Sequence, residues 1–265
     1  MRSSPLVLDA GLPGNYTVFM PKETKGRALP AGSALLHIGT EISADLAPDF
    51  DRWCEEDLRS NLGLPGFVAA RRFVRDEVWP GSGHCPQYLT LYDLQDPSAL
   101  DSQAYASHDQ SIPDPYRSQI SIERSVYREI GELPQNQTQA TGTAILHVTV
   151  DVEPAFTDEF LAWYAEVHVP AVLDAPGMIA ARRFENALLA ESPVLPEGQH
   201  TYCTLYEMED EGVIGRPETL ASSSRGACPT HLESRRIAAN RVYTEIFRSG
   251  SDSSGGVQRA DVRGG

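Results

Sequence analysis

The stretch from Ala144 to Phe184, AILHVTVDVEPAFTDEFLAWYAEVHVPAVLDAPGMIAARRF, decides the fold that we expect for this chain. It reads as an alternating strand, a helix that must kink or restart at Pro170, a Pro-Gly turn and a second strand. The same text occurs earlier, in a less regular form, from Ala34 to Phe73. A chain that repeats itself about every hundred residues indicates two copies of one small domain.

Short matching segments align the two copies. Residues 36–38 (LHI) match 146–148 (LHV) at an offset of 110, whereas the AARRF segments at 69–73 and 180–184 match at an offset of 111. The change of one residue indicates a single-residue gap inside the first helix. Further matches join 90–92 to 204–206 and 126–130 to 242–246.

The hydrophobic patterns predict the same order of elements in both copies, βαββαβ. The expected strands are 35–42, 67–74, 88–93 and 121–130 in the first copy and 144–152, 178–185, 201–207 and 239–247 in the second. Helices are expected from about 48, 96, 158 and 217. Each such unit forms a four-stranded antiparallel sheet with two helices on one face. We therefore expect an α+β fold made of two fused ferredoxin-like repeats.

The rest of the chain divides around these repeats. We expect an N-terminal arm over 1–32 with a short strand at 16–19 as one option, the first repeat over 33–131, and a polar linker over 132–142. The second repeat is expected over 143–247. Residues 248–265 carry few groups to bury, which predicts a disordered tail.

Composition excludes several classes of partner. The 265 residues contain 22 basic and 37 acidic side chains, a formal net charge of −15, so nucleic acid and anionic membranes are disfavoured. The beginning of the chain lacks a signal-peptide pattern, and we expect a cytoplasmic protein, a monomer or homodimer, without a membrane span. The four cysteines show no metal-like or disulfide-like spacing and are expected to be reduced and mostly buried.

One face of each predicted sheet is aliphatic and the other is polar and aromatic. Val148, Val150 and Val152 alternate with His147, Thr149 and Asp151, for example. We expect the aliphatic faces to lie under the helices and the polar faces to enclose a cavity. The residues assigned to that cavity are His37, Glu41, Tyr88, Tyr92, Tyr127, His147, Asp151, Tyr202, Tyr206 and Tyr243.

The second copy resembles a known family in its helix and the strand that follows. Residues 160–170 (FLAWYAEVHVP), continued by Pro176-Gly177 and by 181–184 (ARRF), are similar to the F-x-x-W-Y-x-E-x-H-x-P…PG…ARRF pattern of the EthD-like branch of the dimeric α+β barrel superfamily. The resemblance covers nearly all of 143–247 and, more weakly, 33–131. It implies that two ferredoxin-like units pair their sheets into a ligand-binding barrel, here within one chain.

The first copy departs from this pattern. Asp57 stands where the second copy has His168, and Arg59 replaces Pro170. Only the second copy keeps the histidine, which suggests one asymmetric site or two unequal sites.

The candidate catalytic residues are three histidines. His168 is either a structural residue that satisfies backbone carbonyls freed near Pro170 or a general acid or base that points into the barrel mouth. His37 and His147 occupy equivalent strand positions, and Asp151 stands four residues after His147 on the same face, where it would make that imidazole more basic.

Tyrosines and acids complete the expected site. Tyr88, Tyr92, Tyr127, Tyr202, Tyr206 and Tyr243, with Asp151 and Glu41, are the candidate substrate-binding residues, and ordinary packing is the alternative for any one tyrosine. Four arginines, Arg71, Arg72, Arg182 and Arg183, are expected at strand ends, paired with acids, with one of them as an option for binding a ligand carboxylate.

Cofactor motifs do not support a bound group. The histidines lack metal-ligand spacing, and the chain has no GxSxG, P-loop or Gly-rich dinucleotide turn. We expect no metal and no cofactor, although one histidine beside an apolar cavity keeps haem open.

These observations predict a cofactor-independent acid/base enzyme, a lyase, cyclase or dehydratase, acting on a small aromatic, polyketide-like or enolisable substrate. A histidine would remove a proton, and tyrosine hydroxyls would stabilise the resulting oxyanion. A cofactor-free monooxygenase and a non-catalytic binding or scaffold protein are the alternatives.

Overall fold

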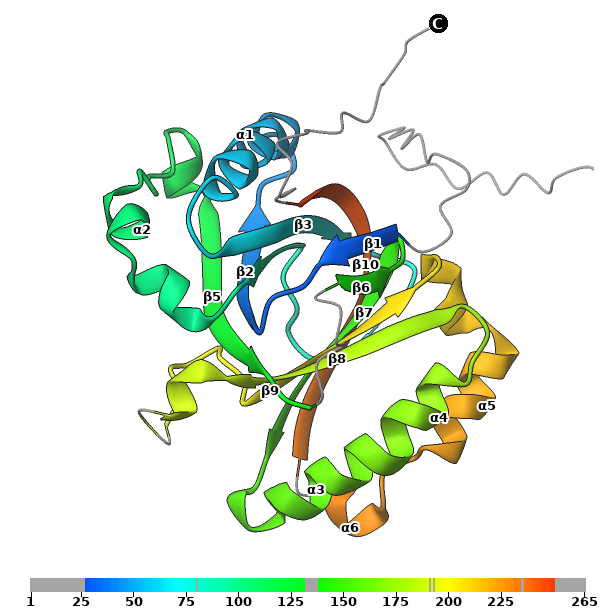
Figure 1. Ribbon diagram of the computed structural model, residues 1–265. Helices are drawn as coiled ribbons and strands as arrows, with labels where there is room; N and C mark the ends of the chain where they lie inside the picture. The colour runs from blue at the N-terminus through cyan, green and yellow to red at the C-terminus, as the bar shows by residue number, and fades with distance from the viewer. Residues whose placement is uncertain are drawn as a thin grey trace, which may run out of the picture.

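The structure is a computed structural model that describes residues 27–79, 81–131, 138–190, 192, 194–234 and 236–250. Eight strands close one antiparallel barrel in the order β10-β3-β4-β2-β5-β8-β9-β7 (Figure 1). The barrel strands are β2 (Ala34–Ile42), β3 (Phe67–Arg75), β4 (Tyr88–Leu94), β5 (Ile120–Glu129), β7 (Ala144–Val152), β8 (Met178–Asn186), β9 (Tyr202–Met208) and β10 (Arg236–Gly250).

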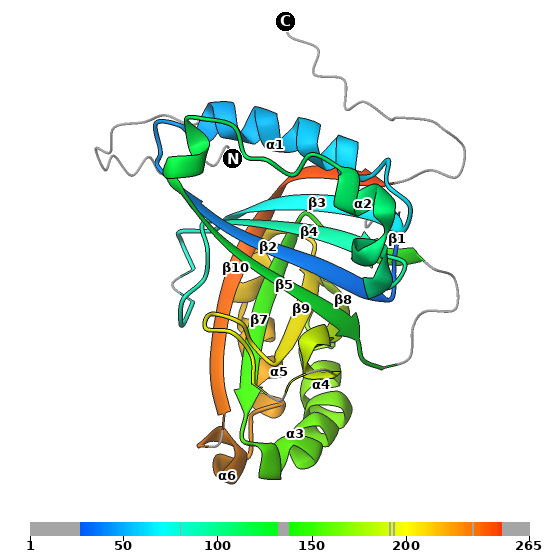
Figure 2. The ribbon, with the colours of Figure 1, turned by 90° about the vertical axis from the view of Figure 1, so that its left-hand side faces the viewer.

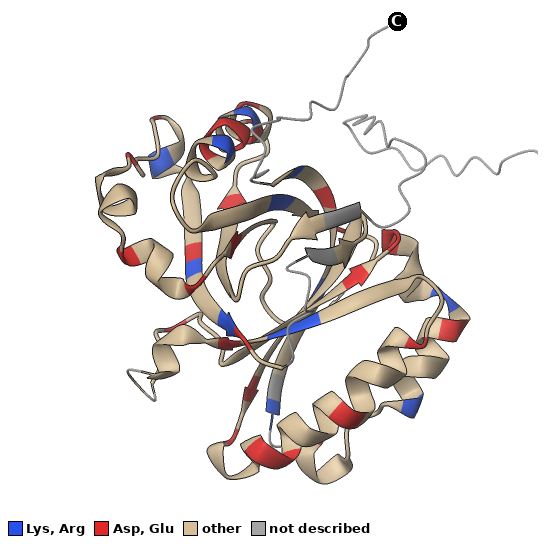
Figure 3. Cartoon of the chain, in the orientation of Figure 1, with Lys and Arg blue, Asp and Glu red and all other residues tan. Residues whose placement is uncertain are grey.

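Helices cover the outside of the barrel in two layers. Figure 2 shows α1 and α2 over the sheet of β2 to β5, and α3 to α6 over the sheet of β7 to β10. Acidic residues occur in both helical layers (Figure 3). The helices are α1 (Ala47–Asn61), α2 (Gln103–Ser107), α3 (Thr157–Trp163), α4 (Val169–Leu173), α5 (Pro217–Arg225) and α6 (Thr230–Glu233).

Helix α1 forms where the sequence predicts a helix start. Pro48 lies in its first turn with Asp49 beside it, and both favour a helix N-terminus. Phe50, Cys54 and Leu58 recur at a spacing of four and are buried against the sheet.

The second helical run contains a π-helical turn, Tyr164–His168, between α3 and α4. Pro170 then lies in the first turn of α4, so the regular α-helical hydrogen bonding is interrupted just before the proline, as the sequence predicts. A π-turn adds one residue to a helix. The extra residue accounts for the change in offset from 110 to 111 between the copies, because α1 shows no such turn.

The strand order is the same in the two halves of the barrel. Residues 34–129 give β5-β2-β4-β3, and residues 144–250 give β10-β7-β9-β8. Two junctions join the halves, where β3 pairs with β10 and where β5 pairs with β8.

Buried arginines bind carboxylates across both junctions. Arg71 contacts Glu207 at 2.5 Å and also Glu245, so a first-half arginine meets second-half acids. Arg182 contacts Asp93 and Glu129, each at 2.6 Å, in the opposite sense. The expectation that these two arginines pair with acids is confirmed, but they lie in the middle of β3 and β8 and not at the strand ends as predicted.

The boundaries of the expected arm, linker and tail differ in three places. β1 (Arg27–Pro30) and β6 (Thr138–Thr141) form a separate antiparallel pair, so parts of the expected arm and linker are strands. β10 continues to Gly250, three residues into the expected tail. The suggested strand at 16–19 and residues 251–265 lie outside the described residues, and the division into two domains stays a prediction.

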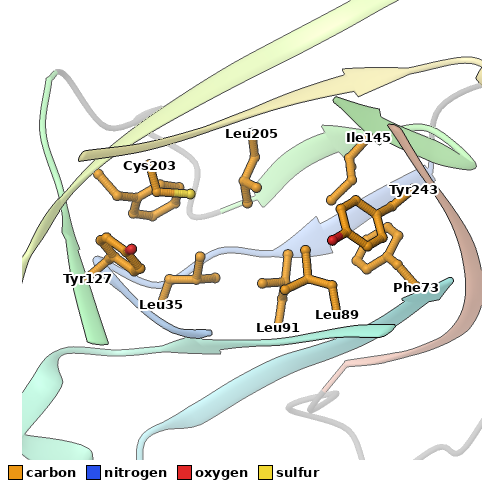
Figure 4. Packing of buried hydrophobic residues seen from close by; sticks show 10 residues of the cluster. Leu35, Phe73, Leu89, Leu91, Tyr127, Ile145, Cys203, Leu205 and Tyr243 are labelled. Carbon is orange, nitrogen blue, oxygen red and sulfur yellow. The ribbon is translucent and has the colours of Figure 1, made fainter. Parts of the chain in front are cut away.

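Side chains fill the barrel interior. Leu35, Leu89 and Leu91 meet Cys203 and Leu205 from opposite walls, with aromatic rings at both ends (Figure 4). Eight strands enclose a space just wide enough for such packing.

The prediction for the faces of β4 and β9 was therefore wrong. Cross-strand partners share a face of the sheet, and the register pairs Leu91 with His37 and Leu205 with His147. Leu89, Leu91, Cys203 and Leu205 consequently point into the barrel, and the four tyrosines on these strands point outward to the helices. A shift of one residue exchanges the two faces of a strand, and the alternating pattern alone does not show which face is inside.

Candidate functional site

His37 and His147 meet at the centre of the barrel. Their Nε2 atoms are 3.0 Å apart, and the side chains are almost completely buried. Burial lowers the pKa of His37 to about 4, and burial together with His37 lowers the pKa of His147 well below its ordinary value. Both rings are therefore neutral at pH 7, with one Nε2–H donating to the other ring.

The tautomers follow from the remaining nitrogens. His37 makes a further hydrogen bond to its own backbone, whereas Nδ1 of His147 has no partner among the described residues. The arrangement of lower free energy has His147 donating from Nε2. Its buried Nδ1 is then an unpaired acceptor, whereas the other tautomer would bury an unpaired N–H donor there.

Tyr127 and Tyr243 complete the barrel centre. Tyr127 packs edge-on against His37, with ring centroids 5.9 Å apart, and Tyr243 packs in the same way against His147 at 6.0 Å. The Tyr243 hydroxyl donates to the carbonyl of Pro86 at 2.7 Å. These two tyrosines lie inside the barrel as predicted, in a tightly filled core.

The two predicted acids lie at the edges of this core and bind backbone. Glu41 accepts from the N–H of Gln87, and Asp151 accepts from the N–H of Thr201. Asp151 also binds Nδ1 of His200 at 2.7 Å. Partial burial opposes ionisation of Asp151, but these hydrogen bonds outweigh it and lower its pKa.

His168 lies in the outer helical layer, so the prediction that it points into the barrel mouth was wrong. Its Nδ1 is 2.7 Å from the carbonyl oxygen of Gly226, at the end of α5. Its ring packs on Tyr164 at 4.8 Å and on Trp163 at 5.1 Å. The ring lies between α5 and the outer face of the barrel, where it also packs edge-on against Tyr206 of β9 at 6.4 Å.

The four outward tyrosines pack beneath the helices. Tyr88 lies under the Arg72 guanidinium at 4.4 Å, and Tyr202 packs near Phe160 of α3. The Tyr206 hydroxyl donates to the Tyr164 hydroxyl at 3.0 Å. Of the predicted tyrosines, Tyr92 lines the larger of the two cavities described below, as does Arg72, one of the arginines named as an option for a ligand carboxylate.

A cavity of about 180 Å³ lies between α1 and the outer face of β2, β3 and β4. We call it the α1 cavity. Its walls are mainly apolar and aromatic, and Gln110, Ile112 and Arg124 lie on its more exposed side. The wall residues include Leu36, Ile38, Phe50, Trp53, Leu58 and Phe67.

A carboxyl group lies at one end of the α1 cavity. Asp57 accepts a hydrogen bond from the Asn61 amide at 2.9 Å and lies 3.4 Å from the Tyr92 hydroxyl, which Asn61 also contacts at 3.0 Å. Desolvation raises the pKa of Asp57 even though both hydrogen bonds favour the carboxylate. Burial and the neighbouring Asp57 raise the pKa of Tyr92, so its phenol stays protonated.

A buried arginine forms part of the cavity floor. Arg72 donates to the Thr90 hydroxyl at 3.2 Å and to Asp51 at 2.8 Å, and its guanidinium is also stacked on Tyr88. Only 1% of its surface is exposed, so its charge acts in a poorly screened environment.

Three residues that line the α1 cavity each carry a buried polar atom that has no hydrogen-bond partner among the described residues. These atoms are Oγ1 of Thr40, Oδ1 of Asn61 and Nε of Arg72. An unpaired buried polar group costs about 1–3 kcal/mol, so three of them around one cavity indicate a place for a polar ligand.

The matching space in the second half is closed. A cavity of about 10 Å³ remains there, beside Tyr164 and Phe160. Tyr164 stands at the position of Cys54 in the aligned copies, and its ring fills the space that a cysteine leaves open.

Sequence reasoning missed Thr40, Asn61 and Asp57 as site residues. The available signal was the set of departures of the first copy from the second. Val150 and Val172 replace Thr40 and Asn61, at offsets of 110 and 111, and both valines are buried. The second copy, which matches the family pattern, suggested His168 as a site residue. The positions at which the first copy differs from it line the open cavity.

Part of the second half is similar to a known protein family. Residues 143–215 match the domain of unknown function DUF4286. No curated protein sequence matches the chain. Within the described residues, no helix has the length and apolar character needed to cross a membrane, and no group of three metal-ligating side chains is present.

Solved structures share the fold at very low sequence identity. An anthrone oxidase-like protein aligns with a TM-score of 0.54 at 10% identity over 85% of this chain and 97% of its own. A putative monooxygenase from Fusobacterium nucleatum aligns at 0.51, with 10% identity over 83% and 95%. A putative chlorite dismutase aligns at 0.51, with 11% identity over 81% and 94%. At this level of identity the likeness shows a shared fold alone, a closed α+β barrel.

Proposed function

We propose that this chain is a tandem member of the EthD-like branch of the dimeric α+β barrel superfamily. We also propose that it is a cofactor-independent acid/base enzyme for small aromatic or enolisable substrates. The matching strand order of the two halves supports the tandem origin. The reaction class is a lyase, cyclase or dehydratase, since each begins with the removal of a proton.

One observation carries the proposal, the partly buried carboxyl of Asp57 at the end of the α1 cavity. A carboxyl group with a raised pKa, beside a phenol and an amide, suits general acid/base catalysis. Asp57 would take a proton from an acidic O–H or C–H group of the substrate. The Tyr92 hydroxyl lies beside Asp57 in the same cavity and would stabilise the oxyanion that forms.

The residues around the α1 cavity do not fit haem. No histidine is among the described residues that line it, so it offers no axial imidazole. The proposed steps therefore use only the side chains of this chain.

Hydrogen–deuterium exchange at substrate carbon tests the proposal without knowledge of the full reaction. We expect the protein to speed deuterium uptake from D2O into at least one member of a panel of phenols and 1,3-dicarbonyl compounds, measured by NMR against buffer. Asp57→Asn should slow this exchange at least about 100-fold, because a general base contributes 10²–10⁴. Glu56→Gln, an exposed acid on the same helix, is the matched control.

Two outcomes contradict the proposal. Exchange at the buffer rate for every compound, or equal exchange by wild type and Asp57→Asn, removes Asp57 as the base. A catalytic role for His37, His147 or His168 stays a prediction, and alanine at each position in the same assay tests it.

A cofactor-free monooxygenase is the second candidate. The apolar lining of the α1 cavity beside a base would protect a substrate carbanion from water until dioxygen reacts with it. Oxygen consumption that depends on Asp57 would favour this alternative, and the same turnover under anaerobic conditions would exclude it.

A further inference from the structure

The unpaired polar atoms of the α1 cavity form an ordered set of donors and acceptors. Nε of Arg72 is a donor, the Thr40 hydroxyl donates or accepts, and Oδ1 of Asn61 is an acceptor. Thr40 and Asn61 are at least nine-tenths buried, and so is Arg72. A ligand that satisfies all three must present an acceptor to Arg72, a donor or an acceptor to Thr40 and a donor to Asn61.

The sheet register places these atoms along one line of the cavity. Arg72 and Thr90 are cross-strand partners in one row of residues, and Tyr92, beneath Asn61, lies two residues along β4. Thr40 pairs with Tyr88, two residues from Thr90 in the opposite direction. Each step of two residues along a strand spans about 7 Å. Thr40 therefore lies at one end of the line, Arg72 in the middle and Asn61 at the other end.

The packing does not need these polar groups. The second half has valines, Val150 and Val172, in place of Thr40 and Asn61, and its helix packs on its sheet with them buried. Hydroxyl and amide groups at these first-half positions therefore serve something other than the fold.

Size limits the ligand to about one ring. The α1 cavity measures about 180 Å³. For comparison, an engineered protein cavity of about 150 Å³ binds benzene. The ring-bearing walls, Phe50, Trp53 and Phe67, suit a flat aromatic body.

The charges of the cavity side chains favour a ligand anion beside Arg72. Arg72 is buried with one counterion, Asp51, whose side chain is about a third exposed. Arg124 adds a second guanidinium at the same cavity, held by the Tyr105 hydroxyl at 2.7 Å.

We propose that the α1 cavity binds a single-ring hydroxybenzoate-type anion, with its carboxylate on Arg72 and Thr40 and its hydroxyl on Asn61 beside Asp57. This assignment rests on the proposed function only for the fate of the hydroxyl proton. In that step the ligand O–H bond breaks, the proton moves to a carboxylate oxygen of Asp57, and the electron pair stays on the ligand as a phenolate.

Calorimetric titration with 4-hydroxybenzoate, benzoate and phenol tests the assignment. We expect 4-hydroxybenzoate to bind at least 10-fold more tightly than phenol and at least 5-fold more tightly than benzoate. Thr40→Val should weaken both carboxylates about 10-fold and leave phenol unchanged, because it removes a donor that only the carboxylate uses. Cys54→Tyr, which introduces the side chain found at the second-half position, should abolish binding of all three.

The variants separate this inference from a merely structural role. Thr40→Val should keep or raise the melting temperature, since the hydroxyl has no partner among the described residues in the free protein. No binding of 4-hydroxybenzoate, equal loss of phenol and carboxylates in Thr40→Val, or undiminished binding by Cys54→Tyr would each overturn the ligand class.

The deuterium-exchange assay distinguishes failure of the ligand class from failure of the proposed function. Tight 4-hydroxybenzoate binding without Asp57-dependent exchange of any compound supports the ligand class and overturns the enzyme. Asp57-dependent exchange of a dicarbonyl compound without hydroxybenzoate binding overturns the ligand class and supports the enzyme.

Discussion

The two helical layers of this barrel differ in what lies beneath them. Under α1, small and polar side chains leave a cavity of about 180 Å³, whereas the Tyr164 ring and a π-turn reduce the matching space to about 10 Å³. The half that keeps the family-like helix pattern is the filled half. A pattern that packs a helix well on a sheet is therefore a poor guide to where a ligand binds.

The barrel junctions, by contrast, are alike in the two halves. Arg71 and Arg182 occupy matching positions and each binds two acids of the other half. The two halves differ under the helices, where each half alone forms the space. They are alike at the barrel junctions, where both halves meet.

The largest expected effect is the loss of a junction arginine. Arg71→Ala and Arg182→Ala should each lower the free energy of unfolding by about 3–5 kcal/mol, because two buried carboxylates lose their partner. Denaturant titration measures it. Arg52→Ala, in an exposed pair with Asp49, is the control and should change stability by less than about 1 kcal/mol. Very unequal losses at the two junctions would contradict their equivalence.

Replacing Tyr164, which fills the space under the second helical layer, should give the next largest effect on stability. Tyr164→Cys should destabilise by about 2–4 kcal/mol, because it removes a buried ring and the partner of the Tyr206 hydroxyl. It should also enlarge the second cavity enough to admit benzene, measured by ligand-induced stabilisation. A loss below about 1 kcal/mol would mean that Tyr164 does not fill the layer.

The barrel centre should respond to pH through the histidine pair. Folded-state pKa values lie below the unfolded value of about 6.5, with His37 at about 4, so below pH 6.5 the unfolded chain binds more protons. Stability should be full above pH 6.5 and fall by up to about 3 kcal/mol for His37 alone as pH drops to about 4.

A double variant isolates this contribution from that of the carboxyl groups. His37→Gln with His147→Gln keeps a polar pair but removes both titrating rings. Its unfolding free energy should depend less on pH between 6.5 and 4 than that of the wild type. The same pH dependence in both proteins would argue against neutral, buried imidazoles.

The smallest effects come from exchanging Thr40 and Val150. Val150→Thr should cost about 1–3 kcal/mol, since it buries a hydroxyl in a filled layer. Thr40→Val should change stability by less than about 1 kcal/mol, in the stabilising direction. Chemical denaturation of both variants checks the difference, and equal losses would show that the polar wall of the α1 cavity supports the fold.

The sequence by itself determined the barrel strands and their order, and it contains the matching segments of the two halves. Alternating and helical periodicities placed the barrel strands and α1 within a few residues, because burying one face of a strand or helix imposes these repeats on neighbouring residues. The single-residue gap between the copies was also visible, and the structure explains it by the π-turn at 164–168.

Only the tertiary structure decided which face of each strand lies inside the barrel and where the cavity lies. His37 and Leu91 share a face because they are partners across two strands, and such a pairing is a contact between segments more than fifty residues apart in the chain. The difference between the open α1 cavity and the closed second-half space likewise depends on the volumes of Cys54 and Tyr164 once each helix is packed on its sheet, which no local sequence pattern records.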